Sequence, residues 1–212
     1  MKNLNQLLLD FDYKQNFKDD DFYVSKSNKS IFNLLNIWPK WEKRFLNISG
    51  EKFSGKTHLI NIFLKKFKGL KIEAHSLNNE SFREVKTHEN IILENLDKNI
   101  NEKLVYSLFN IIDQDNKYLI ITSDIPIVEI NFDLIDWQSR AKDFLLQNIE
   151  KPDDELMFAL IMKNLSDRQI SIEDKLIKFI IKRIDRSYGK IFDFIYKIDE
   201  ISLKKKKSID LK

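Results

Sequence analysis

Residues 45–57 read FLNISGEKFSGKT, in which a short apolar run leads directly into a polar loop with two glycines. The apolar run is typical of a buried strand that ends in a tight turn. The loop, Gly50 to Thr57, matches the phosphate-binding pattern G-x-x-x-x-G-K-[S/T]. Apolar residues at helical spacing follow as far as Phe67, so the pattern lies in its required context of strand, loop and helix.

The residue types of this loop predict a site for the phosphates of a nucleotide. Gly50 and Gly55 let the backbone wrap so that its N–H groups point at phosphate oxygens. Lys56 would neutralise charge on the β- and γ-phosphates, and the Thr57 hydroxyl would be a magnesium ligand. The chain has four glycines, and two of them fall in this loop, which argues against a chance turn. The expected cofactors are therefore ADP or ATP with Mg²⁺.

Further short apolar runs predict the other strands of a sheet, at residues 70–74, 91–93, 118–122 and 144–146. Segments long enough for helices separate these runs, which predicts a parallel sheet with right-handed crossovers. Ahead of the phosphate loop, Ser27 or Asn28 can cap a helix that Pro39 stops.

Beyond Pro152 the pattern changes to helices alone. Pro152 can be the first residue of one helix, whose acidic first turn suits the positive end of the helix dipole. Ser171 can cap a second helix that runs to Ile184, and a third runs from about Lys190 to Leu203. We therefore expect three parts: an arm over residues 1–26, an α/β nucleotide-binding domain with a five-stranded parallel sheet over 27–150, and a three-helix lid over 151–212.

The run at 91–93 ends in Glu94 and Asn95, where a P-loop ATPase usually carries an acidic magnesium ligand and often a catalytic glutamate. Glu94 can take the magnesium role. Asn95 has no carboxylate to accept a proton from an attacking water, so intrinsic hydrolysis should be slow. The alternative is a buried strand with a polar end.

A second strand end carries candidate residues for sensing the γ-phosphate. The run at 118–122 closes with Thr122 and continues into Ser123, and either hydroxyl could hydrogen-bond a phosphate beside it. Strands often end in such residues, so an ordinary polar strand end is the alternative.

Composition bounds the class of protein. Hydrophobic residues make up 42% and charged residues 33%, which suits a globular chain. The absence of cysteine excludes disulfides, thiolate metal sites and a cysteine nucleophile. A net charge of +3 is too small to imply nucleic-acid binding, and the basic run at 204–207 suits a solvated helix end. No segment resembles a membrane span or a signal peptide, so we expect a cytoplasmic protein with no membrane contact.

Several of these stretches together resemble the DnaA-type AAA+ family. They are residues 55–59, the sensor-like 122–126, and 136–140, which end in Arg140. Residues 20–24 and 27–28 are similar to the family's N-terminal linker, which contacts adenine. The resemblance implies an AAA+ P-loop domain and the following nucleotide-binding residues: Phe22, Val24, Gly50, Ser54, Gly55, Lys56, Thr57, His58, Glu94, Thr122 and Lys190.

The lid departs from the family pattern at the position of the arginine that touches the nucleotide phosphates. The corresponding stretch is 185–190, with Gly189 or Lys190 near the expected place. Either Lys190 or Arg186 could take that role.

Two features favour the short regulatory inactivators within this family. Residues 6–11, QLLLDF, resemble the peptide that binds the DNA sliding clamp, with Gln6 at the rim of a pocket and Leu9 and Phe11 inside it. Packing of this arm on its own domain is the alternative. The chain is also expected to end after the lid, without room for the DNA-binding domain of the initiator itself.

The resemblance implies an adaptor that docks on the DNA-loaded clamp and presses Arg140 toward ATP held by DnaA. An arginine finger supplied in trans is worth about 10³–10⁵ in rate. Contact with DNA would be indirect, and a homodimer stays open. The alternatives are a loader or remodeller that hydrolyses its own ATP, and a non-catalytic docking module in which Arg140 is a surface ion-pair residue.

Overall fold

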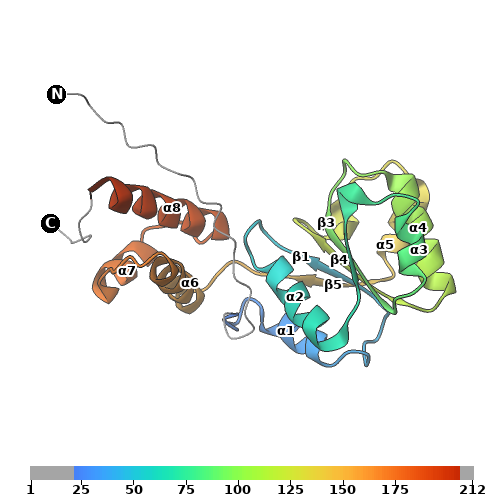
Figure 1. The fold of residues 1–212 in the computed structure, drawn as a ribbon, viewed down its shortest axis with the longest axis horizontal. Helices are drawn as coiled ribbons and strands as arrows, with labels where there is room; N and C mark the ends of the chain where they lie inside the picture. The colour runs from blue at the N-terminus through green and yellow to red at the C-terminus, as the bar shows by residue number, and fades with distance from the viewer. Residues whose placement is uncertain (1–21, 206–212) are drawn as a thin grey trace.

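A computed structural model describes residues 22–205. An α/β unit and a group of three helices follow one another along the chain (Figure 1). Gln6, Leu9 and Phe11 of the clamp-binding prediction lie outside the described residues. No helix within 22–205 is long and apolar enough to span a bilayer.

Five parallel strands form one sheet in the order β2-β3-β4-β1-β5, which confirms the predicted five-stranded parallel sheet. The strands are β1 (Phe45–Ser49), β2 (Leu70–Glu73), β3 (Asn90–Leu96), β4 (Tyr118–Ser123) and β5 (Phe144–Asn148). Strand β1, which leads into the phosphate loop, pairs with β4 on one side and β5 on the other. All five residues of β1 are buried, so packing of this strand fixes the position at which the phosphate loop begins.

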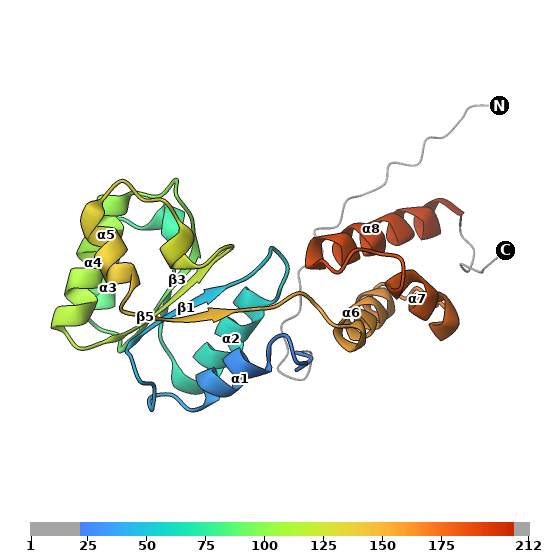
Figure 2. The ribbon, with the colours of Figure 1, turned by 180° about the vertical axis from the view of Figure 1, so that it is seen from behind.

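Helices cover both faces of this sheet (Figures 1 and 2). One face carries α1 (Lys29–Asn36) and α2 (Lys56–Phe67), and the other carries α3 (Ser81–Val85), α4 (Glu102–Gln114) and α5 (Ile135–Ala141). Alternate residues of a strand point to opposite faces. Accordingly, Leu46 and Ile48 pack in the core beneath α1 and α2, while Phe45 packs in the core beneath α4.

The three C-terminal helices are α6 (Asp154–Asp167), α7 (Asp174–Ile181) and α8 (Tyr188–Lys205). They enclose an apolar core of their own, made by buried side chains of all three helices, namely Met157, Ile161, Leu165, Ile177, Ile181, Ile191 and Ile195. One face of α6 and the start of α8 turn toward the phosphate loop, so these helices form a wall of the site described below.

The predicted starts of these helices are wrong. Helix α6 begins after Asp153, whose carboxylate accepts the Leu156 N–H at 2.8 Å, so Pro152 precedes the cap. Helix α7 begins at Asp174, because the chain before it stays extended and packs Ile172 against the core of the three helices. Ser171 therefore caps nothing, and the helix ends at Ile181.

Asn28 occupies the N-cap position of α1 but makes no side-chain cap bond. Its Oδ1 accepts the Ser25 N–H at 2.9 Å, and its Nδ2 donates to the Tyr23 carbonyl at 2.9 Å. The side chain thus fixes the segment before α1 instead of the helix, and this segment reaches the phosphate loop.

Candidate nucleotide-binding site

The phosphate loop joins β1 to α2 in a conformation that needs glycine at both ends. Gly55 has φ +94, and a Cβ there would lie 3.3 Å from Cε2 of Phe22. At Gly50 a Cβ would lie 2.9 Å from Ser54 Oγ and 3.0 Å from Cβ of Ile149. Packing therefore disfavours a side chain at Gly50, and the positive φ of Gly55 strains any residue other than glycine there.

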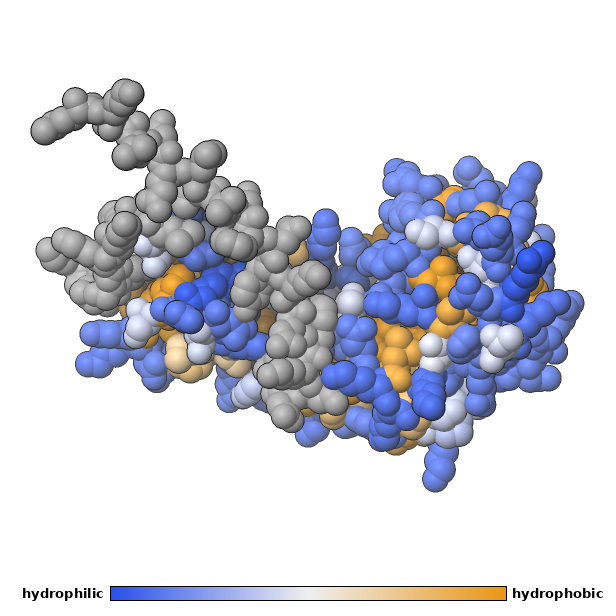
Figure 3. All heavy atoms as spheres, viewed as in Figure 1, coloured by the Kyte–Doolittle hydropathy of each residue, from blue (hydrophilic) through white to orange (hydrophobic). Residues whose placement is uncertain are grey.

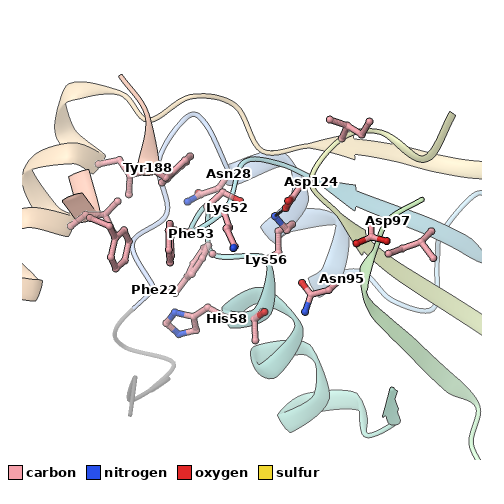
Figure 4. Close-up of a pocket in the computed structure, with 18 of the residues that line it drawn as sticks. Phe22, Asn28, Lys52, Phe53, Lys56, His58, Asn95, Asp97, Asp124 and Tyr188 are labelled. Atoms are coloured by element: carbon pink, nitrogen blue, oxygen red, sulfur yellow. Dashed lines mark hydrogen bonds and ion pairs between the residues drawn. The ribbon is translucent and has the colours of Figure 1, made fainter. Parts of the chain in front are cut away.

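A cavity of about 860 Å³ lies over this loop, between the carboxyl ends of the strands and helices α6 and α8 (Figure 4). Aromatic rings line one part of it: Phe22, Tyr23, Phe53, Tyr188 and Phe192. Cationic and polar groups line the part nearest the strands: Lys52, Lys56, Thr57, Asn95 and Asp124. Flat rings suit a nucleobase and lysines suit phosphates, so the cavity has the size and chemistry of a nucleotide site.

Lys56 is held over the loop by three acceptors. Its Nζ donates to the carbonyls of Gly50 and Glu51 and to Oδ1 of Asp124, the last at 3.0 Å. The Lys56 side chain is only 8% exposed, so its charge is concentrated at the base of the cavity. Beside it, Ser54 Oγ is buried and has no hydrogen-bond partner within residues 22–205. An unsatisfied buried hydroxyl in this loop fits a phosphate oxygen as its acceptor.

The adenine-contacting segment expected from the resemblance is only partly at the cavity. The Phe22 ring meets the His58 ring edge-to-face at 5.2 Å, and both residues line the cavity together with Tyr23. Val24 does not line it and is exposed. Thr57, in the first turn of α2, lines the cavity, and its role as a magnesium ligand stays a prediction.

Glu94, the other expected magnesium ligand, does not line the cavity. It is 1% exposed, and its Oε2 pairs with Lys71 Nζ at 3.0 Å, while Oε1 has no partner among the described residues. A bulge between Leu93 and Leu96 redirects the strand here, and Asn95 adopts φ +59. No group of three or more His, Asp or Glu within 22–205 could hold a metal by itself, so magnesium would depend on phosphate oxygens beside Thr57.

The proposed sensor hydroxyls also point into the fold. Thr122 Oγ1 accepts the Asn95 N–H at 3.0 Å. Ser123 Oγ donates to the Ile125 carbonyl at 2.6 Å. Neither residue lines the cavity, whereas Asp124, the next residue along, lines it and pairs with the loop lysine. Sequence reasoning missed Asp124, although the polar end of this strand was the right signal.

Lys190 is exposed and does not line the cavity. Arg186 pairs with Asp154 at 2.8 Å instead of facing the phosphates. The α8 side chains that do line the cavity are Tyr188 and Phe192. Positions four apart share a helix face, so Tyr188 and Phe192 face the cavity together, and Lys190 lies on the opposite side of α8.

Sequence reasoning also missed the contribution of α6. Three of its polar residues line the cavity, namely Lys163, Asn164 and Asp167. They share one helix face, a spacing that could have been noticed in the sequence. At the base of α8 the buried Tyr188 hydroxyl donates to the Glu150 carbonyl at 3.1 Å. Burial raises the pKa of this phenol, which keeps it protonated as a donor.

Arg140 lies far from this cavity in the topology of the sheet. It sits on α5 just before β5 begins, at the amino edge, whereas the phosphate loop follows β1 at the carboxyl edge. Its Nη1 pairs with Asp113 Oδ2 at 3.1 Å, and its Nη2 donates to Asn110 Oδ1 at 3.2 Å. Arg44 holds the other oxygen of the same carboxylate, at 3.0 Å. The Arg140 side chain is 29% exposed.

No family model matches the chain. Among curated proteins, it is 25% identical to the chromosomal replication initiator protein DnaA of Caldanaerobacter subterraneus subsp. tengcongensis over 218 residues, covering 91% of this chain and 49% of that protein. It is 27% identical to the DnaA of Borrelia hermsii over 200 residues, covering 81% of this chain and 41% of that protein. The chain thus spans about half or less of the length of these relatives.

Among solved structures, domain III of the Thermotoga maritima initiator DnaA superposes with a TM-score of 0.72 at 18% identity, covering 92% of each chain. AMPPCP-bound DnaA from Aquifex aeolicus gives 0.67 at 18% identity, covering 88% of this chain and 67% of that one. The Holliday junction branch migration motor RuvB of Thermotoga maritima gives 0.69 at 12% identity, covering 92% and 68%. These likenesses confirm the expected AAA+ P-loop fold.

Proposed function

We propose that this chain is a nucleotide-binding AAA+ protein of DNA replication. The cavity over the phosphate loop supports nucleotide binding, because Lys56, the unsatisfied Ser54 hydroxyl and several aromatic side chains line it. The similarity to DnaA proteins over most of the chain supports the link to replication, and two of the structural neighbours carry the nucleotide analogue AMPPCP.

Within that class, the role that we propose is an adaptor that promotes hydrolysis of DnaA-bound ATP. The placement of Arg140 is the observation that carries this proposal. An arginine at the amino edge of the sheet cannot reach the chain's own phosphate loop at the carboxyl edge. It can act only on a nucleotide held by another molecule, as an arginine finger in trans does. A partially exposed guanidinium suits that role, because its planar fork can bridge two phosphate oxygens.

Residues 6–11 would tether the chain to the sliding clamp, which would bring Arg140 near DnaA on the same DNA without direct contact between this chain and DNA. The proposal places catalysis in the partner's site. The chain's own cavity would hold ADP or ATP with little hydrolysis, because Asn95, which lines it, has no carboxylate to accept a proton from the attacking water.

One observation favours a second candidate, a docking module without a catalytic role. Arg140 is already paired with Asp113 and Asn110, which is the arrangement of a structural surface residue. A reconstituted assay with DnaA, ATP, clamp and DNA separates the two candidates. The adaptor accelerates hydrolysis of the DnaA-bound ATP, whereas the docking module leaves its rate unchanged.

A further inference from the structure

Two arginines share the carboxylate of Asp113, near the end of α4. Its Oδ2 accepts a hydrogen bond from Arg140 Nη1 at 3.1 Å, and its Oδ1 accepts one from Arg44 Nη2 at 3.0 Å. Asn110 lies one turn earlier on the same face of α4, and its Oδ1 accepts from Arg140 Nη2 at 3.2 Å. Both terminal nitrogens of the Arg140 guanidinium are therefore bonded to α4.

The groups that hold Arg140 are themselves held in place. Helix α4 packs through Phe109 and Ile112, which are buried in the core on this face of the sheet. Arg44, which bonds the other oxygen of Asp113, directly precedes β1, and its guanidinium lies 5.9 Å from the centroid of the Phe45 ring. The acceptor oxygens thus stand on a packed helix, and a second arginine fixes the carboxylate.

The charges of this cluster do not cancel. One carboxylate faces two guanidinium groups, so the cluster keeps one net positive charge. Arg44 Nη1 is buried and has no hydrogen-bond partner within residues 22–205. Because Asp113 is shared, it can orient Arg140 without cancelling the positive charge that would attract a phosphate.

The surrounding surface explains why orientation matters. Hydrophilic side chains predominate at the right-hand end of the molecule in Figure 3, where α4 lies in Figure 1. A long side chain on such a surface, without acceptors beside it, would sample many rotamers. Two acceptors on one helix face restrict Arg140 to few of them, so the guanidinium loses less entropy when it meets an anion.

We propose that Asp113 is a positioning residue, whose carboxylate holds the Arg140 guanidinium in the orientation in which it meets a phosphate of the partner's nucleotide. This step rests on the proposed function, in which Arg140 acts in trans. Each terminal nitrogen of a guanidinium carries two N–H groups, and a bond to α4 engages one of them. Pairing with α4 and contact with a phosphate are therefore compatible.

The hold on Arg140 can be measured without a partner. NMR of the isotope-labelled full chain follows rotation of the guanidinium about its Nε–Cζ bond. We expect Asp113→Asn to accelerate this rotation at least about tenfold, because the amide has no charge and offers one oxygen to two arginines. Asn110→Ala removes a neutral acceptor and should accelerate it less. Asp115→Asn removes the carboxylate two residues further on, which pairs with Lys117, and should leave the rate unchanged.

The second measurement titrates each variant into the reconstituted reaction with DnaA, ATP, clamp and DNA. We expect Asp113→Asn to lower the maximal stimulation of ATP hydrolysis about tenfold, because the guanidinium is misplaced in the transition state. The concentration that gives half-maximal stimulation should not change, whereas a damaged fold or docking surface would raise it. Asp115→Asn should change neither quantity.

A thermal melt checks that the variants are folded. The ion pair between Asp113 and Arg140 is partly exposed, so Asp113→Asn should lower the melting temperature by less than about 4 °C. If the loss is larger, Asn110→Ala replaces this variant in both measurements.

The possible results separate the two proposals. Equal guanidinium rotation in wild type and Asp113→Asn overturns the hold on Arg140, whatever the reaction does. Faster rotation with an unchanged maximal stimulation overturns the positioning role, and so does a higher stimulation, which would mean that Asp113 masks Arg140. Equal stimulation by wild type and Arg140→Ala overturns the proposed function and the positioning role with it, while the rotation rate still decides whether Asp113 holds Arg140.

Discussion

Lys56 Nζ lies 3.0 Å from Asp124 Oδ1, so the lysine of the phosphate loop is held by the residue that follows β4. The two groups come from separate segments that meet only because β1 and β4 are neighbours in the sheet. Their pairing aims the ammonium group across the cavity floor, where phosphates would bind.

Lys56→Ala should weaken binding of a fluorescent ADP or ATP analogue at least about tenfold, because a buried charge-assisted contact is lost. Fluorescence anisotropy measures the affinity. Lys103→Ala, at an exposed position on α4, is the matched control and should bind as the wild type does. Undiminished binding by Lys56→Ala would show that the loop does not hold the phosphates.

The purified chain should hydrolyse ATP far more slowly than about 1 s⁻¹, the low end of typical enzyme rates. Asn95 lines the cavity but offers no carboxylate to activate water, and its Nδ2 donates to Glu73 Oε2 at 2.9 Å. Phosphate release under saturating ATP tests this, with Lys56→Ala as the control for contaminating activity. A rate of about 1 s⁻¹ or more that disappears in Lys56→Ala contradicts the prediction and favours an ATP-driven remodeller.

Replacing Gln6, Leu9 and Phe11 together by Ala should remove binding to the sliding clamp, because such peptides draw most of their affinity from a few anchors. A pull-down with purified clamp measures this, and the thermal melt should stay nearly unchanged. The same change at Lys14, Gln15 and Asn16 is the control and should retain binding. A large fall in melting temperature would mean instead that the arm packs on the folded domain.

Arg140→Ala should abolish stimulation of DnaA-bound ATP hydrolysis in the reconstituted reaction, and Arg140→Lys should impair it nearly as much. Lysine presents a point charge and cannot bridge two phosphate oxygens. Stability should change by less than about 1 kcal/mol, because the ion pair with Asp113 is partly exposed. Arg83→Ala, at an exposed position on α3, controls for loss of one positive charge. Equal stimulation by wild type and Arg140→Ala leaves the docking module as the better account.

The sheet and the phosphate loop could be predicted from sequence because their signals are local. A buried apolar run, two glycines and a following amphipathic helix determine where β1, the loop and α2 lie. The side chains at the strand ends could not be assigned in the same way. Whether Glu94 or Asn95 faces the cavity depends on a bulge, and the bulge depends on pairing with β4.

The lid shows the same division between local and tertiary information. Three helices were expected after the sheet and three are present, but Lys190 was assigned to the site and is exposed. Side chains two residues apart on a helix point about 200° apart, so Lys190 lies on the other side of α8 from Tyr188 and Phe192. Which side meets the cavity is set by packing of α8 through Ile191 and Ile195, and a short motif does not specify that packing. Likewise, the partners of Arg140 come from α4, which no short motif specifies.

The contact between Phe22 and Gly55 limits how far the clamp-binding segment, residues 6–11, can lie from the phosphate loop. Phe22 is the first described residue, and its ring lies against the phosphate loop. About eleven residues separate it from Phe11, and a chain of that length spans at most about 40 Å. A clamp-bound Phe11 would therefore lie within about 40 Å of Phe22. Because the segment between Phe11 and Phe22 is this short, a clamp that binds residues 6–11 would restrict the positions available to the nucleotide-binding domain, and the reverse also holds.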